Sequence, residues 1–257
     1  MTTITRNSGE FCWINILSPD PDKARDFFAT LLGWEFTEMP GMGHSIKVGG
    51  RNIGGLFNTV SARTPNGMQA VLGVMIKVEC ADATAVKIRS LGGKADPAFD
   101  IGPAGRMAVC HDPNGAKFDV WEPKAMHGTD VDSTLHGAPS WYETITSDTE
   151  RAGKFYMTLF GWTPTVSTAS GFPYTSYDLY GTPVAGMMQL TREMIAQGMY
   201  PDWSVYFTVK DTDEAAKVAV AAGGTICVPP TEIPGVGRFC GIVSPDGITF
   251  FAIMAQR

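Results

Sequence analysis

The sequence predicts an α+β protein made of two copies of one domain, each copy containing two β-α-β-β-β units. The first observation is an internal repeat, in which FCWINILSPDPDKARDFFATLLGW (11–34) aligns with PSWYETITSDTERAGKFYMTLFGW (139–162). Three further matches follow in the same order, and the offset between the copies drifts by only four residues. The second observation is that each helical pattern is followed by three strand-like segments joined by turn signals. A doubly wound parallel sheet is disfavoured, because parallel neighbours need long crossovers.

The first unit of the first copy begins with an alternating segment, 11–17, that predicts a strand. Asp20 or Pro21 then starts a helix, and Gly33 ends it in the position where a left-handed residue commonly closes a helix. The apolar residues of this helix fall at helical spacing and are Ala24, Phe27, Phe28, Leu31 and Leu32. Three short strands are expected near 34–38, 43–48 and 52–57.

The second unit repeats the pattern and completes the domain. It predicts a strand at 72–79, a helix from about 82 to 91 that ends at Gly92–Gly93, and strands near 94–98, 106–111 and 116–121. The two copies give domains at 1–123 and 139–257. Segment 124–138 is polar and rich in small residues, which is typical of a linker.

Bulk properties exclude several classes of protein. The net charge of −6 disfavours nucleic-acid and acidic-membrane partners. No apolar run approaches the 18 residues or so of a membrane span, and the N-terminus does not resemble a signal peptide. The five cysteines are odd in number and scattered, which favours buried free thiols in a reducing compartment. We therefore expect a soluble cytoplasmic protein.

Several short motifs carry a family resemblance. They are Trp34 after Leu-Leu-Gly, the pairs Gly105–Arg106 and Gly237–Arg238, and the turns DPNG (112–115) and SPDG (244–247). Together they resemble the vicinal-oxygen-chelate superfamily of glyoxalases, bleomycin-resistance proteins and extradiol dioxygenases, and are most similar to its tandem-domain bacterial glyoxalase-like subgroup. The resemblance covers nearly the whole chain. It implies that the two units of each domain curl into a cupped mixed sheet whose concave face holds a ligand or a metal.

The resemblance also implies where metal ligands would lie: a His on the first strand, a His or acid on the first strand of the second unit, and a Glu on the last strand. The corresponding residues are Trp13, Gly73 and Asp119 in the first copy and Trp141, Ser204 and Phe251 in the second. Only Asp119 can bind a divalent cation, whereas a catalytic metal needs about three protein ligands. We expect no metal and no cofactor at these positions. A displaced linker site, made of His127, Asp130, Asp132 and His136, is the alternative.

Strand periodicity indicates which side chains face each cup. Val74, Ile76 and Val78, like Val205, Phe207 and Val209, are apolar and are expected to face the helices, so the alternate residues face the cups. The predicted ligand-binding residues are Trp13, Asn15, Lys77, Asp119 and Trp121 in the first cup and Trp141, Ser204, Thr208 and Phe251 in the second. Glu143 and Tyr206 form a candidate catalytic pair, because a carboxyl on an aromatic-lined strand needs a donor or a raised pKa.

Structural roles compete with these functional ones. Trp13 and Trp141 can simply fill the space that a metal site would occupy. Lys77 and Asp119 are expected to form an ion pair across the first cup. Arg106 and Arg238 are expected to brace their loops.

Two functions from different classes remain open. The first is a metal-free protein that binds a small aromatic or hydrophobic compound in one or both cups. The second is a lyase, isomerase or dioxygenase-type enzyme that uses Glu143 or a displaced metal site. Internal duplication can supply the partner that single-domain relatives find by pairing, so both a monomer and a homodimer are compatible with the sequence.

Overall fold

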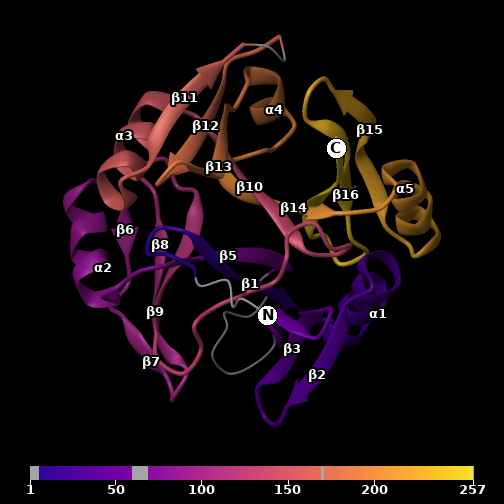
Figure 1. The fold of residues 1–257 in the computed structure, drawn as a ribbon, viewed down its shortest axis with the longest axis horizontal. Helices are drawn as coiled ribbons and strands as arrows, with labels where there is room; N and C mark the ends of the chain where they lie inside the picture. Colours follow the sequence, from indigo (N-terminus) through magenta and orange to yellow (C-terminus); the bar gives the residue numbers. More distant parts are fainter. Residues whose placement is uncertain (1–5, 60–68, 169–170, 257) are drawn as a thin grey trace.

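The computed structural model describes residues 6–59, 69–168 and 171–256, which form two curled mixed sheets with a few helices (Figure 1). The elements of the first sheet and its helices are β1 (Phe11–Ser18), α1 (Pro21–Leu32), β2 (Glu35–Met39), β3 (Gly43–Val48), β4 (Arg51–Asn58), β5 (Val71–Lys77), α2 (Ala81–Ser90), β6 (Lys94–Ala95), β7 (Phe99–Ile101), β8 (Gly105–His111) and β9 (Lys117–Pro123). The predicted α+β class is confirmed.

The second half of the chain repeats this architecture. Its elements are β10 (Pro139–Thr146), α3 (Thr149–Phe160), β11 (Thr163–Ser167), β12 (Tyr174–Leu179), β13 (Thr182–Gln189), α4 (Arg192–Ala196), β14 (Asp202–Thr208), α5 (Thr212–Ala221), β15 (Thr225–Ile233), β16 (Gly237–Val243) and β17 (Thr249–Ala255). None of the helices in the described ranges is long and apolar enough to cross a membrane.

Strand order shows how two units make one cup. The sheets run β2-β3-β4-β1-β5-β9-β8-β6, with β7 also on β8, and β11-β12-β13-β10-β14-β17-β16-β15. In each sheet the first strands of the two units pair antiparallel at the centre, β1 with β5 and β10 with β14. Each of these strands also pairs parallel with the last strand of its own unit. The residues of the central strands therefore line the floor of a cup.

Local sequence explains the helix ends. The Asp20 carboxylate accepts a hydrogen bond from the backbone N–H of Lys23 and Pro21 is the first helical residue, so α1 begins as predicted. Gly33 closes the helix with a φ of 65°. Asp148 and Gly161 do the same for α3. One predicted strand differs: only Lys94 and Ala95 of segment 94–98 form a strand, β6, and pairing resumes in β7 at Phe99, since Pro97 has no N–H for a ladder.

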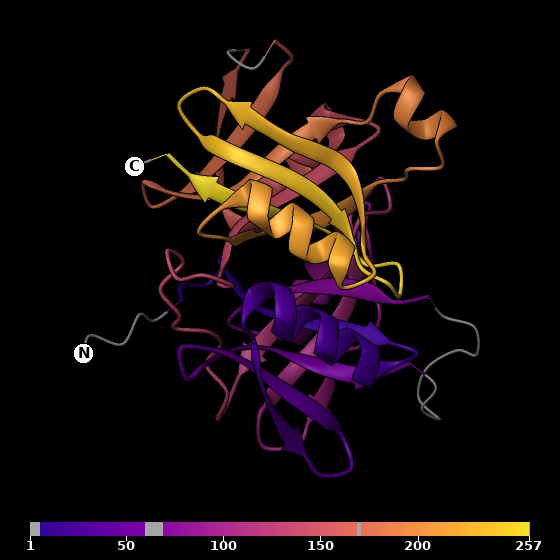
Figure 2. The same cartoon turned by 90° about the vertical axis from the view of Figure 1, so that its right-hand side faces the viewer.

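The two sheets are packed back to back around one hydrophobic core. Helices pair across the halves, α1 beside α5 and α2 beside α3 (Figure 1). Aromatic rings join the halves, with Phe11 stacked on Tyr142 at 4.0 Å between ring centroids and Trp34 edge-on to Phe207 at 5.1 Å. Figure 2 shows the two halves lying one against the other, with α1 and α5 on the same side. Because the shared core occupies the convex sides, the two cups face away from each other.

The segment expected to be a linker is tied to both halves. Thr129 donates its backbone N–H to the Cys12 carbonyl (2.8 Å), and Gly137 donates to the Thr208 carbonyl (2.7 Å). The Gly137 carbonyl accepts a hydrogen bond from Trp34 Nε1 at 2.7 Å, and Val131 is buried. The segment is thus part of the packed structure.

All five cysteines are free, as predicted. Burial is uneven, however: Cys12, Cys110 and Cys240 are buried, whereas Cys80 and Cys227 are exposed, which corrects the expectation that all are core residues.

Candidate functional site

The floor of the first cup is filled by its own side chains. Trp13, Met75 and Trp121 form a separate buried cluster with Cys12, and their exposed fractions are 7%, 2% and 1%. Met126 from segment 124–138 packs on this cluster, and its carbonyl accepts a hydrogen bond from Trp121 Nε1 at 2.8 Å. The tryptophans therefore occupy the space themselves, which fits the space-filling interpretation of Trp13.

The ion pair expected in this cup is absent. The Lys77 ammonium donates to the Arg6 carbonyl at 2.6 Å, away from Asp119. Register explains the error: Asp119 lies opposite Met75, whereas Lys77 lies opposite Trp121. Asp119 is 7% exposed, and its buried Oδ1 has no hydrogen-bond partner. Burial raises the pKa of Asp119 to about 6, with Lys117 opposing the shift.

Lys77 and Thr208 have equivalent structural roles. The Thr208 hydroxyl donates to the Ser133 carbonyl at 2.6 Å, just as Lys77 holds Arg6. Each side chain thus secures the segment that leads into the first strand of its own domain. The remaining polar residue of the first cup, Asn15, donates its amide to the Met75 sulfur at 3.3 Å.

The two arginines brace loops, as expected. Arg106 forms ion pairs with Asp82 and Asp100 at 2.9 and 2.8 Å. Arg238 binds both carboxylate oxygens of Asp213 at 2.7 and 2.8 Å. Each arginine ties a strand to the start of a helix.

The second cup is built differently and is more open. The predicted alternation is confirmed, since Val205, Phe207 and Val209 lie in the shared core. On the other face Tyr206 stacks on Phe251 with 4.6 Å between ring centroids and 14° between planes. Phe239 lies beside both rings, at 6.2 and 6.1 Å. Trp141, Phe239 and Phe251 are only half-buried, so aromatic surface stays accessible in this cup.

Glu143 lies at the centre of this floor. It is 7% exposed, and its Oε1 accepts a hydrogen bond from the Tyr206 hydroxyl at 2.9 Å, which confirms the predicted contact. Ser204 lies directly opposite on β14. Burial raises the pKa of Glu143, while hydrogen bonds from Tyr174 and Tyr206 act to lower it.

Tyr174 is a member of the site that sequence reasoning missed. Its hydroxyl accepts a hydrogen bond from Trp141 Nε1 at 2.8 Å and is also hydrogen-bonded to Glu143. The signal was the alternation in YTSYDL (174–179), in which buried Tyr177 and Leu179 leave Tyr174 on the opposite, cup-facing side. Phe239 was missed as well.

Comparison with known proteins identifies the family. The model of the Glyoxalase/Bleomycin resistance protein/Dioxygenase superfamily matches residues 11–120. The protein named "Putative glyoxylase CFP32" from Mycobacterium tuberculosis is 32% identical over 246 residues, which cover 93% of this chain and 92% of that protein. The chain belongs to the glyoxalase/bleomycin resistance/dioxygenase superfamily.

Other members of this superfamily resemble the chain over similar lengths. The anthracycline biosynthesis protein DauV from Streptomyces sp. is 31% identical over 261 residues, covering 95% of this chain and 93% of that protein. The structure of a Mn(II)-bound glyoxalase from Novosphingobium aromaticivorans aligns with a TM-score of 0.65 and 16% identity, covering 98% of this chain and 83% of the other. That likeness shows the shared fold.

The residues at the superfamily's metal positions do not form a metal site. The register corrects one expected position in each cup: Gly73 lies opposite Asn15, and Met75 is the residue between Trp13 and Asp119. In the second cup Ser204 lies opposite Glu143, and Tyr206 is the residue between Trp141 and Phe251. Across the described ranges, no three His, Cys, Asp or Glu side chains are placed to hold an ion. The linker alternative fails too, since Asp130 pairs with Arg51 at 2.7 Å and Asp132 accepts from Thr134 at 2.9 Å.

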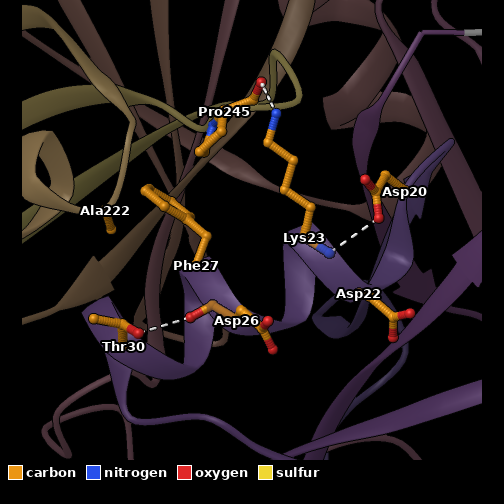
Figure 3. A pocket seen from close by; sticks show the side chains of 8 residues that line it. All are labelled: Asp20, Asp22, Lys23, Asp26, Phe27, Thr30, Ala222 and Pro245. Atoms are coloured by element: carbon orange, nitrogen blue, oxygen red, sulfur yellow. Dashed lines mark hydrogen bonds between the residues drawn. The ribbon is translucent and has the colours of Figure 1, made fainter.

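A hollow of about 530 Å³ lies outside both cups, along α1 (Figure 3). Asp20, Asp22 and Asp26 line it from α1 and its cap, and Pro245 lines it from the other half. Lys23 spans the hollow and donates to the Pro245 carbonyl at 3.3 Å. Asp20 caps α1, Asp22 and Asp26 pair with Arg25 on the same helix, and Lys23 joins the halves, so the charged groups that line this hollow already have partners within the protein.

Proposed function

We propose that this chain binds a small aromatic compound in the cup of its second domain, without using a metal ion. The observation that carries the proposal is Glu143, a buried carboxyl held by a tyrosine hydroxyl beside the stacked rings of Tyr206 and Phe251. Small-molecule pockets commonly combine aromatic lining with a few placed polar groups. A flat ligand can stack on these rings and bond to the carboxyl.

The contrast between the cups supports the choice of the second one. The corresponding surface of the first cup is closed by Trp13, Met75 and Trp121. Its central residue is Asn15 in place of Glu143, and the amide of Asn15 contacts the Met75 sulfur. The second cup keeps half-buried rings around a carboxyl, which is the arrangement that a ligand can reach.

The relatives support an aromatic ligand. DauV is named for anthracycline biosynthesis, and anthracyclines are polycyclic aromatic compounds. The name "Putative glyoxylase CFP32" keeps an enzymatic function open as the alternative for this chain. The absence of a ligand set at the superfamily's metal positions supports binding that depends on the protein's own side chains.

A matched pair of variants tests the location. Phe239 in the second cup and Met107 in the first stand at equivalent repeat positions, and both are half-buried. Isothermal titration with 2-naphthol is expected to give at least tenfold weaker binding to Phe239→Ala and an unchanged affinity for Met107→Ala. The reverse pattern, or no binding to the wild type, contradicts the proposal. Elemental analysis is expected to find no stoichiometric metal, and a stoichiometric ion overturns the metal-free part.

A second candidate function is proton transfer by Glu143. It is favoured because burial raises the pKa of this carboxyl, a common property of groups that serve as general acids or bases. If a bound probe is converted, Glu143→Gln is expected to slow conversion by about 10²-fold or more. NMR of the probe mixture before and after incubation measures this, and conversion that survives the substitution excludes the role.

A further inference from the structure

Trp141 starts a one-way chain of hydrogen bonds in the second cup. An indole N–H is a donor only. Trp141 Nε1 donates to the Tyr174 hydroxyl at 2.8 Å, so the Tyr174 oxygen is the acceptor in this hydrogen bond. The Tyr174 proton must then be donated elsewhere, and its hydrogen-bond partner is Glu143. The polarity of the chain is therefore fixed from Trp141 through Tyr174 to the carboxyl.

Glu143 accepts hydrogen bonds from two directions, one from Tyr174 at the end of this series and one from Tyr206. Tyr206 donates to Glu143 Oε1 at 2.9 Å from β14, on the side of the floor away from β12. A carboxylate has about four acceptor positions, and the two tyrosines use two of them. The positions that remain can accept a hydrogen bond from a ligand in the cup. When Glu143 is ionised, its carboxylate also repels an anion, because the described contacts of Glu143 include no positively charged side chain to offset its charge.

The backbone is shaped to permit this chain. Gly186 on β13 is the register partner of Glu143, and a Cβ at this position would overlap the Tyr174 hydroxyl. It would also lie 2.9 Å from Trp141 Nε1. Glycine is therefore required for the two polar atoms to meet above the strand.

The first cup has a tryptophan at the corresponding position but lacks this series of hydrogen bonds. By repeat position Trp13 corresponds to Trp141, whereas Gly43, Asn15 and Met75 replace Tyr174, Glu143 and Tyr206. All three polar partners are thus specific to the second cup. The duplication itself therefore provides a control residue, Trp13.

We propose that the second cup selects neutral aromatic ligands that donate a hydrogen bond, such as phenols, over aromatic carboxylates and ethers, and that Trp141 sets this selectivity through Tyr174. This rests on the proposed function, because it assigns a ligand class to the same cup. Trp141 and Tyr174 act as positioning residues, since they fix which groups Glu143 can accept from. Phe251 and Tyr206 supply the stacking surface, which binds the ligand's ring whether the ring carries a hydroxyl, an ether or a carboxylate group.

Three probes of one ring size test the selectivity: 2-naphthol, 2-methoxynaphthalene and 2-naphthoate, titrated by calorimetry at neutral pH into the full chain. We expect 2-naphthol to bind the wild type at least tenfold more tightly than either of the other two. In Trp141→Phe the preference for 2-naphthol over the ether is expected to fall below threefold. In Glu143→Gln the discrimination against 2-naphthoate is expected to fall as well.

The controls separate this inference from the proposed function. Trp13→Phe is expected to keep the wild-type preference. Tyr174→Phe removes only a hydroxyl and replaces Trp141→Phe if that variant melts below the assay temperature. Equal binding of the three probes to the wild type overturns the proposed selectivity but not the proposed binding function. If none of the probes binds, both proposals are overturned. An unchanged preference in Trp141→Phe and Tyr174→Phe overturns the role of the hydrogen bonds that run from Trp141 through Tyr174 to Glu143.

Discussion

The buried carboxyl of Asp119 lacks the partners that would offset its burial, because its Oδ1 has no hydrogen bond and its pKa is raised to about 6. An acid whose pKa is raised on folding costs nothing while it is protonated in both states. The cost appears as the pH rises from the unfolded value near 4 to about 6, and it is constant above that range.

Asp119→Asn is therefore expected to stabilise the protein at pH 8 and to have little effect at pH 4. The shift corresponds to at most about 3 kcal/mol of unfolding free energy. Urea unfolding of both proteins at the two pH values measures the difference. A gain of the same size at pH 4 and pH 8 would show that ionisation of Asp119 is not the cause.

Asp246, in the turn after β16, has one carboxylate oxygen without a partner, whereas its Oδ1 accepts a hydrogen bond from the Ser244 hydroxyl. Its counterpart Asn114 donates its amide to Thr146 Oγ1 and to the Asp148 carbonyl, at 2.7 and 2.8 Å. Asp246 has no N–H to donate, and its buried Oδ2 has no partner. We expect Asp246→Asn to stabilise the chain by about 1 kcal/mol and Asn114→Asp to destabilise it by a similar amount. Thermal unfolding tests the pair, and shifts of the same sign contradict the explanation.

At the scale of elements, one buried network joins α3, the turn after β8 and β14. The Tyr156 hydroxyl donates to Asp112 Oδ2 at 3.1 Å and accepts from Trp203 Nε1 at 3.0 Å. Removing the hydroxyl leaves a buried acceptor and a buried donor without this partner.

Tyr156→Phe is expected to lower the free energy of unfolding by about 2 kcal/mol. Tyr177→Phe is the matched control, because Tyr177 is equally buried but its hydroxyl contacts only the weakly accepting Met187 sulfur, at 3.7 Å. Denaturant unfolding compares the two. Equal losses would show that the network contributes nothing beyond packing.

Sequence reasoning succeeded where chemistry is local and failed where it depends on register. Asp20, Pro21 and Gly33 mark the ends of α1 by backbone chemistry alone, and the repeat transfers that information to α3. The pair Lys77–Asp119 was wrong because the partner of Lys77, Arg6, comes from a segment outside the strands. Tyr174 was missed because its repeat counterpart is Gly43, so the duplication gives no hint of it.

At the scale of the whole molecule, the two halves share a single core and are expected to depend on each other. Phe11 stacks on Tyr142, and Phe118 packs edge-on to Tyr156 and Phe155, across the boundary between the halves. Separating them exposes these rings to water.

The full chain is therefore expected to unfold in one cooperative transition. Residues 139–257 expressed alone are expected to lose their near-ultraviolet circular dichroism signal and to aggregate, since one side of their core is uncovered. Calorimetry and size-exclusion chromatography measure both properties. Two independent transitions in the full chain, or a monomeric and cooperatively melting half, would contradict a shared core.

The tryptophan side chains allow binding in the second cup to be distinguished from binding in the first. The chain contains six tryptophans, of which Trp13 and Trp121 report on the first cup and Trp141 on the second. Nitrogen-15 labelling of the indoles, with assignment by single Trp→Phe variants, allows each signal to be followed by NMR during titration with 2-naphthol. Binding in the second cup is expected to give a saturable shift of the Trp141 signal and to leave the signals of Trp13 and Trp121 unmoved. Saturable shifts of Trp13 and Trp121 with an unmoved Trp141 signal would contradict it.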